Sequence, residues 1–319
     1  MNHIFFLFLE SLIILPFLAG FYLKKKLQLN QTEKKQLSER MIKINLLFFE
    51  PIIIIWFIGK LKYSPTTFYL PFSGLFLVFL GFLVGYLFSY KLSPRNRITI
   101  VVNTSLANHG YTMGGIICYF LLGEEGLSKA LIFISYFYLY LYGFLFPWIR
   151  WKLPSNYKNQ TYLSLKQKLL DYRLFPLYGL MIALILFIFQ IPLPENQFLS
   201  FMVQTIVYIS IVIYYLALGI NLELKKLFYW NKPILFVLGI KFIVVPLITL
   251  IVLWLIPSEF LSLFDKKIVL IMSFMPGAVY SIVSSIIFNL NTRFTVQIFV
   301  LSTMIFLAMI LPILYLTLT

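Results

Sequence analysis

Two short stretches of this sequence interrupt long apolar runs and carry groups that could bind a solute. The first, residues 108–115, has three glycines among its last six positions, and the second is Met275-Pro276-Gly277. Each glycine weakens a helix by about 1 kcal/mol relative to alanine. Proline costs roughly 3 kcal/mol, because it lacks an N–H and clashes with the preceding turn. Helices broken in this way leave peptide groups that can hold an ion or a polar solute inside a membrane.

Three ionisable side chains, Glu10, Glu50 and Lys241, fall inside apolar runs, where a charge costs about 2.5–3.5 kcal/mol on insertion scales. Glu50 directly precedes Pro51, and the proline ring frees a carbonyl one turn earlier. A carboxylate beside such carbonyls could bind a proton or a sodium ion. It could instead pair with a nearby cation or be wetted by a cavity. Lys241 could neutralise an anionic solute, although an ion pair with one of the two glutamates is the commoner arrangement.

We expect one binding centre, because the two interrupted stretches fall at corresponding places in the chain. Asn108 and Pro276 carry this expectation, whereas any single Gly or Ser here could equally serve helix packing. His109 could relay a proton, although a lone histidine in a membrane helix more often packs. Other polar side chains of these stretches are Thr104, Ser105, Ser273, Ser284 and Ser285. The candidate substrate- or ion-binding residues are Asn108, His109, Gly110, Thr112, Gly115, Pro276, Gly277, Tyr280, Ser281, Glu50 and Lys241.

The elements that must position these residues are membrane helices. Of the 319 residues, 61% are hydrophobic and 12% are charged, whereas soluble domains are typically about 45–50% apolar and about 25% charged. Apolar runs of about 20 residues recur, each long enough to cross the hydrocarbon core as a helix, and no period-two alternation favours a barrel. We therefore predict an all-α polytopic membrane protein. Its ten predicted spans are 4–23, 42–60, 66–90, 97–121, 126–149, 175–193, 198–220, 232–256, 267–289 and 293–317.

The positive charge of the chain predicts its orientation. The formal net charge is +15, but the basic residues fall in short loops without forming a continuous face, which argues against a nucleic-acid partner. Loops that join odd to even spans hold 20 Lys and Arg residues, against five on the opposite side. Basic loops stay in the cytoplasm. Both termini are therefore expected outside, in a membrane that we take to be a bacterial inner (plasma) membrane.

A hydrophilic stretch divides the ten spans into five and five. Residues 1–149 form the expected first repeat, 150–174 a cytoplasmic loop, and 175–319 the second repeat, all within one structural domain. An odd number of spans in each half reverses the orientation of the second half, which is the geometry of an inverted repeat. The fourth span of each half carries the interruption. We therefore expect a 5+5 inverted repeat whose fourth and ninth helices are broken and cross near the midplane.

Several motifs resemble those of a known family. The pattern Asn108-x-Gly110-Tyr111, followed by Leu122-Gly123-x-x-Gly126-Leu127, resembles the fourth span of the auxin efflux carrier family, within the bile-acid/sodium-symporter-like group. Further similar patterns are Met275-Pro276-x-Ala278, Leu301-Ser302-Thr303, Leu216-x-Leu218-Gly219-x-Asn221-Leu222 and, in the second span, Pro51. The resemblance implies scaffold and transport parts, and organic anions such as dicarboxylates or indole-type acids as substrates. Gly115 and Met113 depart from the family pattern, which usually has proline and glycine there.

These features favour a secondary transporter (permease) that moves a small organic anion by alternating access. Proton coupling or the membrane potential is the expected driving force, with sodium symport of the bile-acid type as the alternative. An enzyme is not expected, since Asp171 and Asp265 lie in or beside loops and no His/Glu cluster suits zinc. A channel or a non-transporting sensor stays open as another class. No cofactor is expected; the expected partners are the anion and the bilayer, and a homodimer is compatible with the sequence.

Overall fold

The computed structural model describes residues 3–28, 30–60, 65–137, 139–153, 175–194, 196–221 and 232–318. Within these ranges all regular structure is helical, apart from one isolated β-bridge between Ala107 and Gly277. The chain divides into two compact units. Unit 1 comprises Met1–Tyr63 and Tyr162–Leu224, and unit 2 comprises Ser64–Thr161 and Lys225–Thr319. Each unit therefore combines a segment from the first predicted half with one of nearly equal length from the second.

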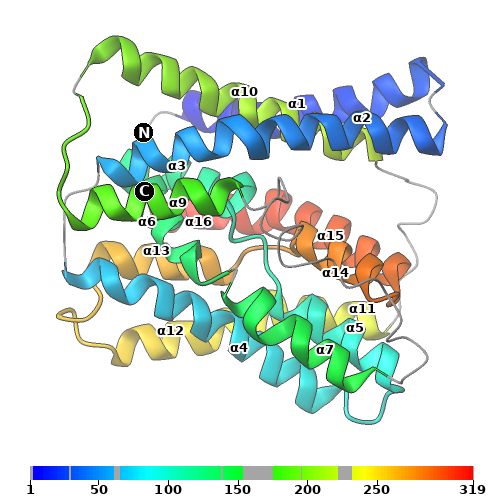
Figure 1. The fold of residues 1–319 in the computed structure, drawn as a ribbon. Coiled ribbons are helices and arrows are strands. Elements are labelled where there is room, and N and C mark those ends of the chain that lie inside the picture. The colour runs from blue at the N-terminus through cyan, green and yellow to red at the C-terminus, as the bar shows by residue number, and fades with distance from the viewer. Residues whose placement is uncertain are drawn as a thin grey trace. The chain divides into compact units, whose positions relative to one another are not determined.

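Unit 1 is built from helices that pack through small residues. Its helices are α1 (His3–Lys26), α2 (Gln31–Ile44), α3 (Glu50–Gly59), α9 (Phe175–Ile188) and α10 (Gln197–Asn221). A capping box between Asn30 and Glu33 begins α2. Helices α1 and α10 run side by side (Figure 1), and a Cβ added to Gly219 would lie 2.0 Å from the Phe17 carbonyl oxygen. Glycine is thus required for this close approach.

Unit 2 contains the shorter helices and both predicted interruptions. Its elements are a 3₁₀ helix (Pro65–Tyr69), α4 (Leu70–Phe88), α5 (Pro94–Ser105), α6 (Ile116–Phe133), α7 (Phe146–Lys152), α11 (Lys232–Gly239), α12 (Val245–Leu255), α13 (Leu263–Ser273), α14 (Val279–Ile287), α15 (Thr292–Ile305) and α16 (Leu311–Leu318). Helices α4 and α5 pack closely, since a Cβ on Gly81 would lie 2.3 Å from the Thr104 carbonyl oxygen. This contact fixes the C-terminal end of α5 against α4, and the first interruption begins directly after that end.

Prolines set the position of wide, π-helical turns in both units. Such turns span Asn45–Phe49, Leu139–Leu145, Ile240–Val244 and Phe306–Ile310, and each ends two residues before Pro51, Pro147, Pro246 or Pro312, respectively. A proline lacks an N–H and its ring clashes with the carbonyl four residues earlier. Adding one residue to the turn relieves this clash, so the sequence itself specifies where the helices widen.

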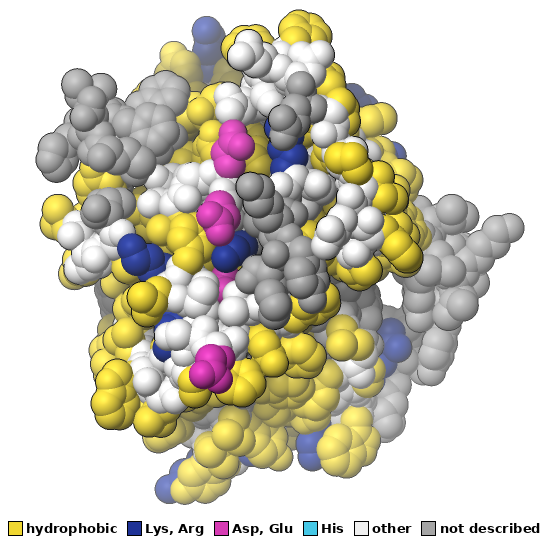
Figure 2. All heavy atoms as spheres, turned by 90° about the vertical axis from the view of Figure 1, so that its left-hand side faces the viewer, with side chains coloured by type: hydrophobic (Ala, Val, Ile, Leu, Met, Phe, Trp, Pro, Cys, Tyr) yellow, Lys and Arg dark blue, Asp and Glu magenta, His cyan; other side chains and the backbone are white. Residues whose placement is uncertain are grey.

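The helices are those of an integral membrane protein. Among the described residues, six helical stretches are long and apolar enough to cross a membrane: Gln36–Gly59, Thr66–Phe88, Met113–Lys152, Gln197–Ala217, Lys232–Leu255 and Thr292–Leu318. Large apolar side chains lie on the outside, for example Trp254, which is 83% exposed. Figure 2 shows hydrophobic side chains over much of the visible surface, with acidic and basic ones together on the face turned to the viewer.

Three predicted spans, 97–121, 175–193 and 267–289, are missing from these six stretches for a physical reason, whereas the side chains at the start of span 4–23 lie outside the described residues. Helices occupy much of every predicted interval, but α9 is shorter than a full span. The intervals 97–121 and 267–289 are each divided by non-helical backbone after Ser105 and Ser273. Neither divided interval is counted as one long helix. The ten-helix inverted repeat and its halves stay predictions, and most of the 150–174 loop lies outside the described residues.

Candidate functional site

The two predicted interruptions meet inside unit 2. Helix α5 ends at Ser105 and is followed by extended backbone, while α13 ends at Ser273 and α14 begins only at Val279. The two non-helical segments pair in antiparallel fashion. The Asn108 N–H donates to the Pro276 carbonyl oxygen at 2.8 Å, and the Ala278 N–H donates to the Leu106 carbonyl oxygen at 3.4 Å. We call this pairing the crossing.

Glycines allow the backbone to approach so closely at the crossing. The Gly277 N–H donates to Ser302 Oγ of α15 at 2.9 Å, and a Cβ on Gly277 would lie 3.3 Å from the Phe299 Cα. The Gly114 N–H donates to the Asn108 carbonyl oxygen at 3.1 Å. A Cβ on Gly114 would lie 2.6 Å from the His109 carbonyl oxygen, too close for any larger residue without movement.

Lys241 brings a positive charge to the crossing. It lies in the π-helical turn Ile240–Val244, and its side chain is buried. Its Nζ donates to the Leu106 carbonyl oxygen at 2.8 Å, the same oxygen that accepts from the Ala278 N–H. A buried ammonium that uses one of its three N–H groups on the protein keeps donors for an anionic group nearby. The crossing therefore combines peptide dipoles with one cation.

His109 is held by its neighbours on both ring nitrogens. Nδ1 lies 2.5 Å from the Tyr136 hydroxyl, and the imidazole also forms a hydrogen bond with the backbone of Met272; we assign this second bond to Nε2. The edge of the Phe133 ring packs against the imidazole, with 5.5 Å between ring centroids. With both nitrogens engaged, the geometry favours a packing role over a free proton relay.

The other candidates in the divided intervals have varied surroundings. Gly110 directly precedes the π-helical turn Tyr111–Gly115, which follows the first interruption, and Gly115 ends that turn. Tyr280 packs edge-on against Phe137. Ser281 is buried, and its Oγ has no hydrogen-bond partner among the residues that the structure describes. The side chains of Thr112 and Glu10 lie outside the described residues.

Serine and threonine side chains near the crossing mostly bond within the helices. The Ser284 hydroxyl donates to the Tyr280 carbonyl oxygen at 2.7 Å. Ser285 Oγ lies 2.8 Å from Thr295 Oγ1, which also accepts from Asn103 Nδ2 at 2.9 Å. This buried network ties α5, α14 and α15 together. Sequence reasoning missed Asn103 and Thr295, which bond to each other although they lie 192 residues apart in the chain.

Glu50 belongs to unit 1 and has its own environment. Its side chain is 8% exposed, and Oε1 accepts a hydrogen bond from the Tyr214 hydroxyl at 2.6 Å. Among the described residues of unit 1, no Lys or Arg lies within ion-pair distance of it. Two of the predicted alternatives for Glu50, a proton or cation site and a wetted carboxylate, therefore stay open at this point.

Sequence reasoning also missed a buried ion pair in unit 2. Lys129 Nζ lies 2.9 Å from Asp265 Oδ1, and the two side chains are 7% and 0% exposed. Asp265 Oδ2 accepts from the hydroxyls of Thr66 at 2.6 Å and Ser262 at 2.7 Å. Burial acts to raise the pKa of Asp265, but the hydrogen bonds and the charge of Lys129 outweigh it and hold the pKa below its usual value. The pair braces α6, which follows the first interruption, against α13, which precedes the second.

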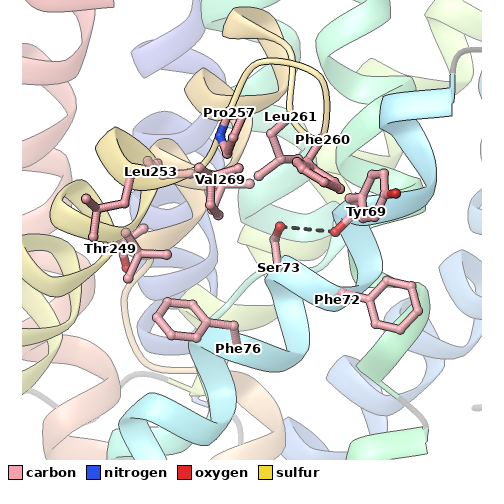
Figure 3. Close-up of a pocket in the computed structure, with 13 residues that line it drawn as sticks. Tyr69, Phe72, Ser73, Phe76, Thr249, Leu253, Pro257, Phe260, Leu261 and Val269 are labelled. Atoms are coloured by element: carbon pink, nitrogen blue, oxygen red, sulfur yellow. Dashed lines mark hydrogen bonds between the residues drawn. The ribbon is translucent and has the colours of Figure 1, made fainter.

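The apolar cavity of unit 2 is separate from the crossing. It has a volume of about 550 Å³ and lies between α4, α12 and the loop after α12. In Figure 3, Tyr69, Phe72 and Phe76 line one side of it, and Leu253 and Val269 lie opposite. Three of its lining residues carry a hydroxyl, and those of Ser73 and Thr249 donate to the carbonyl oxygens of Tyr69 and Val245. The other lining side chains are almost all apolar, and no residue of the crossing is among them.

The described residues contain no group of three or more His, Cys, Asp or Glu side chains that could hold a metal ion.

Comparison with known proteins adds no assignment, because no family model matches the chain and no curated protein matches it. The family resemblance therefore stays a prediction from the motifs, and any function has to be argued from the geometry.

Proposed function

We propose that this chain is a secondary membrane transporter that moves a small organic anion by alternating access. The observation that supports it most is the antiparallel pairing of two interrupted helices between Ala107 and Gly277. Irregular backbone inside hydrocarbon persists only where protein or a cavity satisfies it. Two such interruptions that meet in one unit suit a ligand site better than a packing defect.

The electrostatics of the crossing favour an anion. Helix α14 and the π-helical turn before α6 begin there, whereas α5 and α13 end there, so the partial positive charges of two N-terminal ends face the partial negative charges of two C-terminal ends. The side chain of Lys241 therefore decides the sign of the site. The side-chain amine of Lys241, hydrogen-bonded to the Leu106 carbonyl oxygen, adds positive charge when it is protonated. We propose that Asn108, Lys241 and the backbone around Gly277 contact the carboxylate of the substrate.

Matching positions in the two halves support an inverted repeat of ten helices. Pro147 follows Gly110 by 37 residues, and Pro312 follows Pro276 by 36. Each of these prolines comes two residues after a π-helical turn. Each compact unit also takes one segment from either half, as a scaffold unit and a transport unit would. On this basis we propose a permease of the auxin efflux carrier type in a plasma membrane, with both termini outside.

A carrier fits these features better than a channel, which usually assembles its selectivity elements by oligomer symmetry. The test is flux through vesicles that contain the purified protein. Saturable uptake and counterflow of an organic acid support the carrier, whereas flux that rises linearly with concentration supports a channel. Absence of flux despite binding would point to a sensor.

The ligand is found by a thermal-shift screen of the purified protein with dicarboxylates and indole-type acids. Stabilisation reports binding to the folded state by mass action. Lys241→Met is expected to weaken binding of any hit by about 10- to 100-fold, since a hydrogen bond to a charged group contributes roughly 1.5–3 kcal/mol. Lys267→Met is the control, because Lys267 is exposed and, within the described ranges, donates to the Leu318 carbonyl oxygen at the C-terminal end of α16. Equal affinity of the two variants would remove Lys241 from the site.

Coupling is proposed to use protons or the membrane potential, and Glu50, as a buried carboxylate of unit 1, is the residue through which a coupling cation would act. Glu50→Gln is expected to abolish or uncouple pH-dependent uptake and to leave the protein folded. Uptake with unchanged pH dependence in that variant would take Glu50 out of the mechanism. Sodium coupling is the second candidate. The observation that favours it is the burial of the Glu50 carboxylate beside the Tyr214 hydroxyl, with no Lys or Arg of the described part of unit 1 within ion-pair distance.

A further inference from the structure

Unit 1 contains a buried group of oxygen atoms outside the crossing. Asn45 and Ser210 are both 0% exposed, and Asn45 Nδ2 donates to the Ser210 carbonyl oxygen at 3.2 Å. Four positions along α10, Tyr214 donates to Glu50. Residues four apart in a helix lie on one face. Asn45 begins the π-helical turn Asn45–Phe49, and Glu50 directly follows it. Both side chains therefore face the same strip of α10.

Two oxygen atoms of this group are without partners. Asn45 Oδ1 and Ser210 Oγ are buried and accept or donate no hydrogen bond within the described residues. A buried polar atom left unsatisfied costs about 1–3 kcal/mol, so such atoms are rare in native proteins and call for an explanation. Two of them in residues that contact each other point to a bound species that completes their coordination.

The backbone adds further oxygen atoms. The N–H of Glu50 donates to the Asn45 carbonyl oxygen, five residues back, which is the bond of a π-helical turn. Pro51 has no N–H, so a carbonyl of the preceding turn loses its intrahelical donor. Along one strip of α10 the group therefore has a carboxylate, an amide oxygen and a hydroxyl, and the turn before Pro51 can add a carbonyl. No Lys or Arg of the described part of unit 1 balances the charge.

We propose that Asn45, Glu50 and Ser210, with the carbonyl freed by Pro51, bind a sodium ion in unit 1. Hard cations take oxygen ligands of these kinds, and unwound or widened helices supply the carbonyl oxygens for Na⁺ in transporters. One carboxylate balances one positive charge, so the site suits a monovalent ion. The Tyr214 hydroxyl holds the carboxylate of Glu50 toward the ion. This site does not rest on anion transport by unit 2.

The test measures sodium binding to the purified, full-length protein without any organic acid. Melting temperature is recorded in NaCl, KCl and choline chloride at equal ionic strength, and ²²Na⁺ binding is measured in parallel. We expect a saturable rise in melting temperature with Na⁺ that choline does not reproduce. No Na⁺-specific rise together with no ²²Na⁺ binding would overturn the site.

Ser210→Ala separates a ligand from a merely structural residue. It removes an unpartnered oxygen and adds no volume, so the melting temperature in choline is expected to stay equal or to rise. The Na⁺ affinity is expected to fall by about 10- to 100-fold. Thr205→Ala on the same helix is the matched control, because the Thr205 hydroxyl bonds to the Phe201 carbonyl oxygen of its own helix. Wild-type Na⁺ affinity in Ser210→Ala would overturn the assignment.

Glu50→Gln distinguishes sodium from a proton. If the site binds Na⁺, this variant loses the Na⁺-dependent shift at every pH. A melting temperature that depends on pH alone, through Glu50 and without any effect of Na⁺, would overturn the sodium proposal in favour of a proton site. Anion binding at the crossing is measured separately with choline as the only cation, so failure of the sodium site and failure of the transporter proposal give different results.

Discussion

The crossing in unit 2 and the oxygen group in unit 1 both depart from regular helix, but in different ways. At the crossing the helices unwind completely, and the carbonyl groups of Leu106 and Pro276, freed from helical hydrogen bonds, accept from the other segment. In unit 1 the helix only widens by one residue, between Asn45 and Glu50, and side chains supply the polar atoms. Glycine allows the first arrangement and proline causes the second.

The two regions also differ in the sign of their charge. The crossing contains a buried ammonium, Lys241, and the unit 1 group contains a buried carboxylate, Glu50. Buried charges are kept where they are paired or where they bind something of opposite sign. The comparison therefore predicts an anion in unit 2 and a cation in unit 1. Unit 2 also has a buried ion pair beside its interruptions.

The largest expected effect concerns that ion pair. Lys129→Met leaves Asp265 buried beside Thr66 and Ser262 without its cation, and removing one partner of a buried pair costs about 3–5 kcal/mol. Thermal melting or chemical unfolding of purified Lys129→Met checks this, and Lys267→Met is the exposed control. A loss below about 1 kcal/mol would show that the ion pair does not brace α6 against α13.

A glycine at the crossing comes next. Gly114→Ala places a Cβ 2.6 Å from the His109 carbonyl oxygen, and overpacking of this kind costs typically 1–3 kcal/mol. Gly239→Ala is the matched control, because nothing lies within 4 Å of its added Cβ. Alanine favours helix over glycine by about 1 kcal/mol, so the control is expected to be neutral or stabilising. Equal melting temperatures for the two variants would contradict the close backbone packing at the crossing.

A smaller effect is expected from pH. The folded-state pKa of Asp265 lies below its ordinary value of 3.8. Its contribution to stability is therefore complete above the ordinary pKa and is lost as pH falls through the folded-state pKa. The melting temperature should be insensitive to Asp265 from pH 8 to about pH 5 and should fall only below about pH 4. The Asp265→Asn variant should lose this fall in melting temperature at acid pH. If the fall is unchanged in the variant, other carboxylates cause it.

The positions of both interruptions could be predicted from the sequence, because glycine and proline act locally on the backbone. The π-helical turns before Pro51 and Pro246 have the same local cause, and a closer examination of proline positions would have found them. The apolar runs likewise predicted where helices lie, since span length follows from bilayer thickness.

The partners of the functional groups could not be predicted, because they come from distant parts of the chain. Nothing near Lys241 in the sequence indicates the Leu106 carbonyl oxygen, and the residues around Lys129 predict a loop charge and not a partner of Asp265. The unpartnered oxygens of Asn45 and Ser210 are properties of packing, and no residue pattern announces them.

The most direct test of the crossing is a disulfide between its two segments. Paired positions of the kind formed by Ala107 and Gly277 have Cα atoms about 4.5 Å apart, which suits a disulfide. The variant Ala107→Cys/Gly277→Cys is made in a Cys118→Ser background and oxidised in membranes, with Ala107→Cys/Gly239→Cys as control. Rapid cross-linking that stops anion uptake, reversed by reductant, is the predicted result. Failure of the first pair to cross-link more readily than the control would mean that the interruptions do not meet, and no binding centre would remain.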